Sequence, residues 1–212
     1  SLVGRGVRAF GFDTGPGNCL IDLAVRRMTR GRRAFDRGGA IAARGRVDEA
    51  KMRRLLRQPY FLRRPPKSLD RGDFGEAYLE RHFPRGRGRP EDAVAEATFF
   101  TALTIADAAR RFVGKGRARE LIVSGGGALN PVLLDELRRQ AAPLAVRSIA
   151  EFGIPPLAKE PAAIALMALE ALRGRVNHCP RATGARGPRI LGKISPSYPP
   201  PPRGNWAAAT SP

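Results

Sequence analysis

The stretch that decides the fold is AFGFDTGPGNCLID, residues Ala9–Asp22. Apolar residues run into a single acid, Asp13, and a loop rich in glycine and proline follows before apolar residues return. The segment Val7–Phe12 reads as a strand, and apolar residues at helical spacing predict a helix over Leu20–Met28. Asp13 is therefore expected at the carboxyl end of a strand, where α/β proteins place functional residues.

The loop after Asp13 supports two readings. Thr14 to Asn18 would keep the approach to the acid sterically open, and their backbone N–H groups could hold an anion or a polyol. Alternatively, Asp13 and Asn18 only cap backbone groups of a turn. Composition alone favours neither interpretation of the loop over the other.

The composition indicates one globular domain with appendages. The chain has 212 residues, 42% of them hydrophobic, which is enough to bury a core. Its formal net charge is +19, yet only five of the 38 basic residues are lysine and the arginines are spread over almost every segment. An even spread of arginine is better explained by a bias in codon usage than by a surface that binds nucleic acid. Only the segment Arg26–Arg64 has enough basic residues close together to form a basic patch.

The cysteines and the hydropathy exclude several classes of protein. Cys19 and Cys179 lie far apart, and no His or Cys stands at metal-ligand spacing, so neither a zinc site nor a disulfide scaffold is indicated. A reducing cytoplasm fits this usage. No leader peptide opens the chain and no apolar run approaches about 18 residues, so we expect no membrane span.

Further along the chain, strands and helices alternate, which argues for an α/β layer architecture. The expected elements are a helix from about 49 to 56, a proline-stiffened connection over 60–74, a helix over 90–113 with one apolar face, a buried strand over 121–124, a helix after Asn130 and Pro131, a strand over 145–148 and a helix over 161–172. From Ser195 onward the sequence is rich in proline and predicts an extended or disordered tail.

Several other glycines and polar residues have both a structural and a functional interpretation. Gly125, Gly126 and Gly127 follow a strand and would let a nucleotide press against bare backbone, although tight strand–helix packing explains them at least as well. Glu160 heads an apolar helix, where the helix dipole stabilises an acid. His82 and His178 have no partners at readable spacing, and we expect both on the surface.

Taken together, these motifs resemble those of the anhydro-N-acetylmuramic acid kinases. FDTGPGN with LID, FDRGGAIAARGRV, PYF, PPKS, SGGGALN, GIPPLAKE and NHCPRATGA…ILGKISP occur in the family's order and spacing, over about Phe10–Pro196. The resemblance implies the actin-like sugar-kinase fold, in which two RNase H-like α/β domains surround a cleft. It implies that residues 1–194 form the C-terminal kinase domain and 195–212 a tail.

The resemblance also implies an activity. The family uses ATP, with Mg²⁺, and water to open the 1,6-anhydro bond of anhydro-N-acetylmuramic acid and to phosphorylate the freed O6 in bacterial cell-wall recycling. By motif, Asp13 would be the catalytic base, and Glu160 would position sugar or water. The other implied contacts are Thr14, Gly15 and Asn18 to the sugar, and Gly125, Gly126, Gly127 and Asn130 to the nucleotide. No metal ligand is assigned, and the resemblance is compatible with a cytoplasmic enzyme that forms a homodimer.

Some positions depart from the family pattern. Pro161 follows Glu160 where family members usually have alanine, which removes one N–H at the helix start. The chain starts at Ser1, and nothing corresponds to the family's upstream domain, so we expect a C-terminal fragment of a longer kinase. The rival class is an inactive kinase fragment whose arginine-rich surface binds nucleic acid or acidic partners. Another sugar or acyl-phosphate kinase is disfavoured by the combination of DTGPGN and PPKS.

Overall fold

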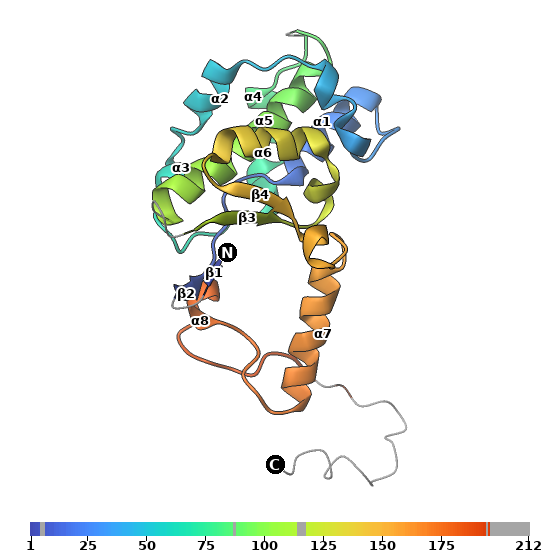
Figure 1. Ribbon diagram of the computed structural model, residues 1–212. Coiled ribbons are helices and arrows are strands. Elements are labelled where there is room, and N and C mark those ends of the chain that lie inside the picture. The colour runs from blue at the N-terminus through green and yellow to red at the C-terminus, as the bar shows by residue number, and fades with distance from the viewer. Residues whose placement is uncertain (5–6, 87, 114–117, 194, 196–212) are drawn as a thin grey trace.

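The computed structural model describes residues 1–4, 7–86, 88–113, 118–193 and 195. Figure 1 shows a body of helices above a small parallel sheet, and an extension below it that holds the first two strands and a long helix. The tail predicted from Ser195 onward lies almost wholly outside the described residues. The architecture is α/β with few strands, as the alternating pattern predicts.

The strands of the described ranges form two separate two-stranded sheets. β1 (Leu2–Gly4) pairs with β2 (Val7–Phe10) in antiparallel fashion. β3 (Glu120–Val123) pairs in parallel with β4 (Ala145–Ser148). All three predicted strands are confirmed, although the first ends two residues earlier than expected, at Phe10.

The helices account for most of the described structure. They are α1 (Asn18–Thr29), α2 (Glu49–Leu55), α3 (Pro59–Leu62), α4 (Glu76–His82), α5 (Asp92–Ala108), α6 (Pro131–Ala141), α7 (Lys159–Leu172) and α8 (Pro180–Thr183). Short turns of helix are η1 (Arg37–Gly39), η2 (Ala42–Arg44), η3 (Arg71–Phe74), the π-type η4 (Ala109–Val113), η5 (Gly126–Leu129) and η6 (Ile149–Phe152). The five helices predicted from periodicity are confirmed, whereas α3 and η3 replace the expected plain connection and α4 was not predicted.

α5 is the centre of the body, with α1, α2 and α6 packed against it. The predicted apolar face of this helix is buried, and burial extends beyond it to nearly all sides of the helix. Its small alanines let neighbours approach closely, and its threonine hydroxyls are satisfied by the helix's own carbonyls. Thr98 Oγ1, for example, donates to the carbonyl of Val94 at 2.9 Å.

Among the residues that the structure describes, only one face of the β3–β4 sheet is covered. Leu121 and Val123 of β3 pack with Leu133 and Leu137 of α6, whereas Ile122 points the other way and is 48% exposed. The prediction of a buried strand is therefore wrong for one of its two faces, because successive side chains of a strand alternate and α6 covers a single side.

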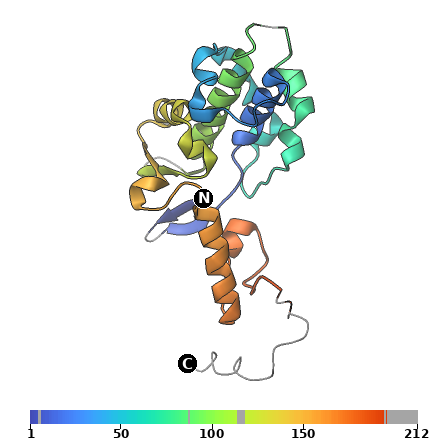
Figure 2. The same cartoon turned by 90° about the vertical axis from the view of Figure 1, so that its right-hand side faces the viewer.

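α7 extends away from the helical body, as both views show (Figures 1 and 2), and none of its residues is buried. The segment after α7 returns alongside it, since Asn177 Nδ2 donates to the carbonyl oxygens of Met167 and Leu191 at 2.9 and 2.8 Å. Among the helices of the described ranges, none combines the length and the apolar character needed to cross a bilayer.

Candidate active site

Asp13 is held by three hydrogen bonds that leave part of its carboxylate open. Its backbone N–H donates to the carbonyl of Lys67 at 3.1 Å, and the hydroxyl of Tyr60 donates to its own carbonyl at 2.7 Å. The backbone N–H of Leu69 donates to Oδ2 at 2.9 Å. Within the described chain nothing donates to Oδ1. The side chain is exposed, so Asp13 is oriented and can still accept a proton from a ligand or water.

Lys67, the lysine of PPKS, is a buried cation that the sequence analysis gave no role. It is 4% exposed, and its Nζ donates to the carbonyls of Tyr60 and Phe61 at 3.1 and 3.4 Å. The Nζ also lies 4.6 Å from the centroid of the Tyr60 ring. Burial, and then the positive charge of Arg63, lower the pKa of Lys67. Lys67 thus fixes the segment whose backbone holds Asp13.

The loop between Asp13 and α1 rests on α5. A Cβ at Gly15 would lie 2.8 Å from Cβ of Thr104, so only glycine fits there. Thr101 Oγ1 donates to the carbonyl of Gly17 at 2.9 Å, and the φ of Gly17, 55°, is one that other residues rarely adopt. The glycines of the loop are therefore explained by contact with α5 and by backbone shape. Thr14, the remaining predicted sugar contact, is partly buried in the same loop.

Asn18 and the glycine triplet, distant in sequence, lie side by side. A Cβ added to Gly126 would be 3.2 Å from Nδ2 of Asn18, and one added to Gly127 would be 3.2 Å from its Oδ1. Gly127 would also meet Leu133, whereas Gly125 has open space around it but a φ of 78° that favours glycine. Asn130 caps α6 by accepting from the backbone N–H of Leu133 at 3.2 Å, which confirms the predicted cap.

A pocket of about 500 Å³ opens where these residues meet. It is lined by Asn18, Ile21, Asp22, Phe35, Asp36, Arg37, Gly38, Gly126, Leu129, Asn130 and Leu157. Residues expected at the sugar site and at the nucleotide site thus share one concave surface. The lining combines apolar walls with a few polar groups, as ligand pockets commonly do.

The pocket contains two carboxyl groups that the sequence analysis did not single out. Asp36 is buried, and its two oxygens accept from the backbone N–H groups of Ile41 and Ala42 at 2.9 Å each, so it organises the loop after Phe35. Burial raises the pKa of Asp22, and Arg26 one helical turn on opposes that rise. The spacing of Asp22, four residues after Asn18 on one helix face, was the available signal.

Glu160 is not brought into this arrangement. It stands in the first turn of α7 with its side chain 82% exposed, and its ion-pair partner is the neighbouring Lys159 at 3.7 Å. The start of α7 is tied to the glycine triplet, because the N–H of Gly125 donates to the carbonyl of Pro156 at 2.8 Å. That bond brings Leu157 to the pocket, while Glu160 is absent from its lining.

The two histidines are less exposed than expected. His82 is partly buried against Tyr78, with 4.4 Å between ring centroids. Burial, followed by the charges of Arg81 and Lys51, lowers the pKa of His82. His178 is also partly buried and accepts from the backbone N–H of Arg189 at 3.0 Å. Both therefore lie at the surface, as expected, but each is partly covered by neighbouring chain.

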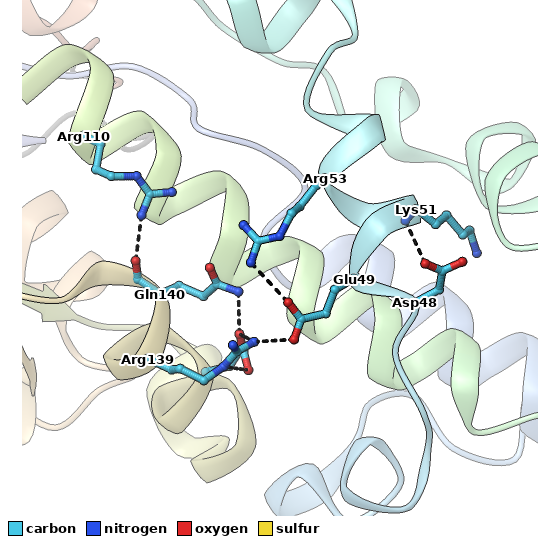
Figure 3. A network of polar contacts seen from close by, with 8 residues as sticks. Asp48, Glu49, Lys51, Arg53, Arg110, Arg139 and Gln140 are labelled. Atoms are coloured by element: carbon cyan, nitrogen blue, oxygen red, sulfur yellow. Dashed lines mark hydrogen bonds and ion pairs between the residues drawn. The ribbon is translucent and has the colours of Figure 1, made fainter.

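Many of the arginines are used in local ion pairs. In Figure 3, Glu49 of α2 bridges Arg53 on its own helix and Arg139 of α6, at 3.1 Å in each case. Within the described residues, the arginines that have a carboxylate within 4.0 Å are Arg44, Arg53, Arg111, Arg138, Arg139, Arg147, Arg173 and Arg175. Part of the positive charge is therefore compensated within the fold.

The residues present fit a nucleotide better than a protein-held metal. Gly126 borders a pocket with apolar walls, and a Cβ there would come within 3.2 Å of Nδ2 of Asn18, so the side chain of Asn18 takes the space beside this glycine. Among the described residues, no three His, Cys, Asp or Glu side chains gather as a metal site. Mg²⁺ that accompanies ATP is commonly held by one or two carboxylates together with phosphates, so such a site needs no cluster of that kind.

Comparison with known proteins identifies the family. A family model described as anhydro-N-acetylmuramic acid kinase matches residues 1–197. An anhydro-N-acetylmuramic acid kinase of Streptomyces avermitilis is 41% identical over 92% of this chain and 51% of its own length. The enzymes of that name from Synechococcus sp. (strain CC9605) and Caldanaerobacter subterraneus are 40% and 35% identical over 91% and 87% of this chain. The chain spans about half the length of these curated relatives. The chain belongs to the anhydro-N-acetylmuramic acid kinase family.

Proposed function

We propose that this chain is the C-terminal part of a cytoplasmic kinase that opens the 1,6-anhydro bond of anhydro-N-acetylmuramic acid and phosphorylates O6. The observation that carries the proposal is the course of one loop. It presents Asp13 with one carboxylate oxygen open, and a few residues later it brings Asn18 against the glycine triplet. The candidate base and the candidate nucleotide loop are thereby connected by a short segment that packs against α5.

In this proposal Asp13 acts as a general base. Its carboxylate takes a proton from water as the water oxygen bonds to the anomeric carbon, and the bond from that carbon to O6 breaks. The electron pair left on O6 then attacks the γ-phosphorus of ATP, and ADP leaves. Mg²⁺, when bound with ATP, would offset charge on the phosphates. The hydrogen bond from Leu69 to Oδ2 orients the carboxylate for the first step.

The other predicted residues take supporting roles in the proposal. Thr14, Gly15 and Asn18 shape the sugar side, and Gly125, Gly126, Gly127 and Asn130 form the nucleotide side. Glu160 would have to approach the sugar through a movement of α7 or on assembly with further chain. The proposal includes the RNase H-like fold of a two-domain sugar kinase, with residues 1–194 as its C-terminal domain and 195–212 as a tail.

The test is sugar-dependent ADP release. The assay is run on the 212-residue chain alone and on the chain joined to the remainder of a family-length kinase. We expect turnover in the joined enzyme, and we expect Asp13→Asn to lower kcat by about a hundredfold or more while sugar binding persists, because the amide keeps an oxygen for Leu69 but cannot take the proton. Asp135→Asn, on the exposed face of α6, is the matched control.

Two results would contradict the proposal. Near-normal kcat in the joined Asp13→Asn enzyme would remove Asp13 as the base. ADP release that does not depend on anhydro-N-acetylmuramic acid would exclude the proposed substrate.

A further inference from the structure

A second cavity, of about 590 Å³, lies between α2, the end of α4 and the first turns of α5. We call it the α2–α4 cavity. It shares no lining residue with the pocket beside the glycine triplet. In Figure 1, α2 and α4 lie at the end of the helical body that is farther from β3 and β4. The α2–α4 cavity is therefore separate from the candidate active site.

Three arginines line the α2–α4 cavity without an ion-pair partner. Arg46 precedes α2, Arg54 lies in the last turn of α2, and Arg81 lies in the last turn of α4. All three are exposed, and in the part of the chain that the structure describes no carboxylate oxygen lies within 4.0 Å of their side-chain nitrogens. By contrast, their sequence neighbours Arg44 and Arg53 are ion-paired. The three guanidinium groups are therefore available to donate to a bound anion.

The carboxyl groups of the α2–α4 cavity already accept hydrogen bonds from the fold. Asp92 accepts from two backbone N–H groups at 2.8 Å each, one of them that of Arg46. Asp48 accepts from the backbone N–H of Lys51 at 2.8 Å, and Glu96 accepts from the ammonium group of Lys51 at 2.6 Å. These acids shape the turns around the cavity, and one of them compensates the lysine. An anionic ligand would therefore find its donors in the three arginines.

The lining also includes apolar side chains and a histidine. Val47, Leu55 and Phe83 line the cavity, and such side chains contact the carbon skeleton of a ligand. Burial, and after it the positive charge of Arg81, lower the pKa of His82, which lines the same cavity. The α2–α4 cavity thus combines positive charge with apolar contact surface.

We propose that the α2–α4 cavity binds a phosphorylated small molecule, with the phosphate held by the three arginines and the carbon skeleton against the apolar side chains. The guanidinium fork matches the oxygens of a phosphate group. A phosphate monoester carries a charge of about −2 near neutral pH and three terminal oxygens, whereas a carboxylate carries a single charge and two oxygens. Three separate guanidinium groups therefore favour phosphate. A cavity of about 590 Å³ has room for a carbon skeleton beside it, which favours an ester over the free ion.

This inference does not depend on the proposed kinase reaction, because no residue of the α2–α4 cavity has a role in it. The test therefore uses a probe that is neither a nucleotide nor a sugar. Phenyl phosphate carries a phosphate on a flat apolar ring. Benzoate keeps the ring and replaces the phosphate by a carboxylate, and inorganic phosphate lacks the ring.

The experiment measures binding of the three probes to the 212-residue chain by titration calorimetry at about 0.15 M NaCl, where exposed charges are screened. We expect phenyl phosphate to bind roughly tenfold more tightly than benzoate or inorganic phosphate, because only it uses both parts of the lining. Arg54→Gln and Arg81→Gln should each weaken phenyl phosphate roughly tenfold. Arg119→Gln, which removes an exposed arginine just before β3, is the matched control and should leave the affinity unchanged. Thermal melting verifies that each variant is folded.

Four results would overturn the inference. The wild-type chain could fail to bind phenyl phosphate measurably, which would leave no site. Equal binding of benzoate would remove the preference for phosphate, and equal binding of inorganic phosphate would remove the contact with a carbon skeleton. An affinity for phenyl phosphate that is the same in Arg54→Gln and Arg81→Gln as in the control would place the binding outside the α2–α4 cavity.

Discussion

Asp22 is a residue whose burial opposes the stability of the fold. Its carboxyl group is partly buried beside the pocket, and this burial raises its pKa above the ordinary value of 3.8. Arg26 on the same helix counteracts the rise, and the charged groups of Asp36 and Arg37 line the same pocket. The folded protein therefore binds a proton at Asp22 over a pH range in which the unfolded chain has already released it.

The sign of the stability effect follows directly. Because the folded-state pKa is raised, the ionised carboxylate destabilises the fold above that pKa, and the penalty disappears as the pH falls through it. We predict that Asp22→Asn raises the urea midpoint at about pH 7, and that this advantage shrinks as the pH approaches the ordinary aspartate value. Asp135→Asn, which changes an exposed carboxyl, serves as the control. A lower midpoint for Asp22→Asn at about pH 7 would mean that the carboxylate has a favourable partner in the fold.

At this scale the sequence predicts local features and misses distant contacts. The N-cap role of Asn130 could be predicted because a cap depends on the next few residues, and the structure confirms it. The contact of Asn18 with the glycine triplet could not, since it joins residues more than a hundred positions apart. Nor could the exposure of Glu160, which depends on what packs around α7. The roles in catalysis assigned to these residues remain predictions.

At the scale of elements, the segment from α3 to η3 acts as the support of Asp13. It contains no regular strand, yet its backbone supplies the carbonyl of Lys67 and the N–H of Leu69 that hold the aspartate. The segment is itself tied together by Lys67, whose ammonium group donates to two carbonyls of α3. A single buried side chain therefore connects the geometry of the site to the packing of an irregular segment.

We predict that Lys67→Met lowers the free energy of unfolding by about 1–3 kcal/mol. Methionine fills a similar volume, but it removes the ammonium donor from both carbonyl groups. The carbonyl of Tyr60 keeps the backbone N–H of Arg63 at 3.3 Å, whereas that of Phe61 has no other donor among the described residues. Lys159→Met on the exposed start of α7 is the matched control and should change stability by less than about 0.5 kcal/mol. Urea unfolding measures both. A Lys67→Met protein as stable as the wild type would show that the cost of burying the cation cancels its hydrogen bonds.

Element type was more predictable than element environment. Apolar periodicity correctly locates α1, α2, α5, α6 and α7 along the chain. It does not predict α4, a short helix between a glycine and a run rich in glycine and arginine. Periodicity also fails to distinguish a helix buried on nearly all sides, such as α5, from one with no buried residue, such as α7, because both are rich in alanine and large apolar residues.

For the whole molecule, the main anomaly is α7. Its sequence, KEPAAIALMALEAL, is apolar around the full circumference, and such helices are normally buried. Here no residue of α7 is buried, and Ile164, Leu166 and Leu172 are 64%, 59% and 52% exposed. The chain spans about half the length of its curated relatives, so further chain of a family-length kinase is a natural cover for this helix.

We predict that the isolated 212-residue chain self-associates through α7. Exposed apolar surface of this extent favours contact with a second copy, and the high net charge opposes it only at low salt. In sedimentation velocity the wild type should show mass that rises with concentration and with salt. The double variant Ile164→Glu, Leu166→Glu should sediment as a monomer, whereas Leu62→Glu, which changes a 52%-exposed leucine on α3, should behave as the wild type. Addition of the remaining half of a family-length kinase should also suppress self-association of the wild type, because it competes for the same helix.

Two outcomes would contradict this prediction. A wild-type chain that stays monomeric at every protein and salt concentration would show that the exposed apolar surface of α7 does not drive association. Association that persists in the double glutamate variant would show that the contact between copies lies outside α7.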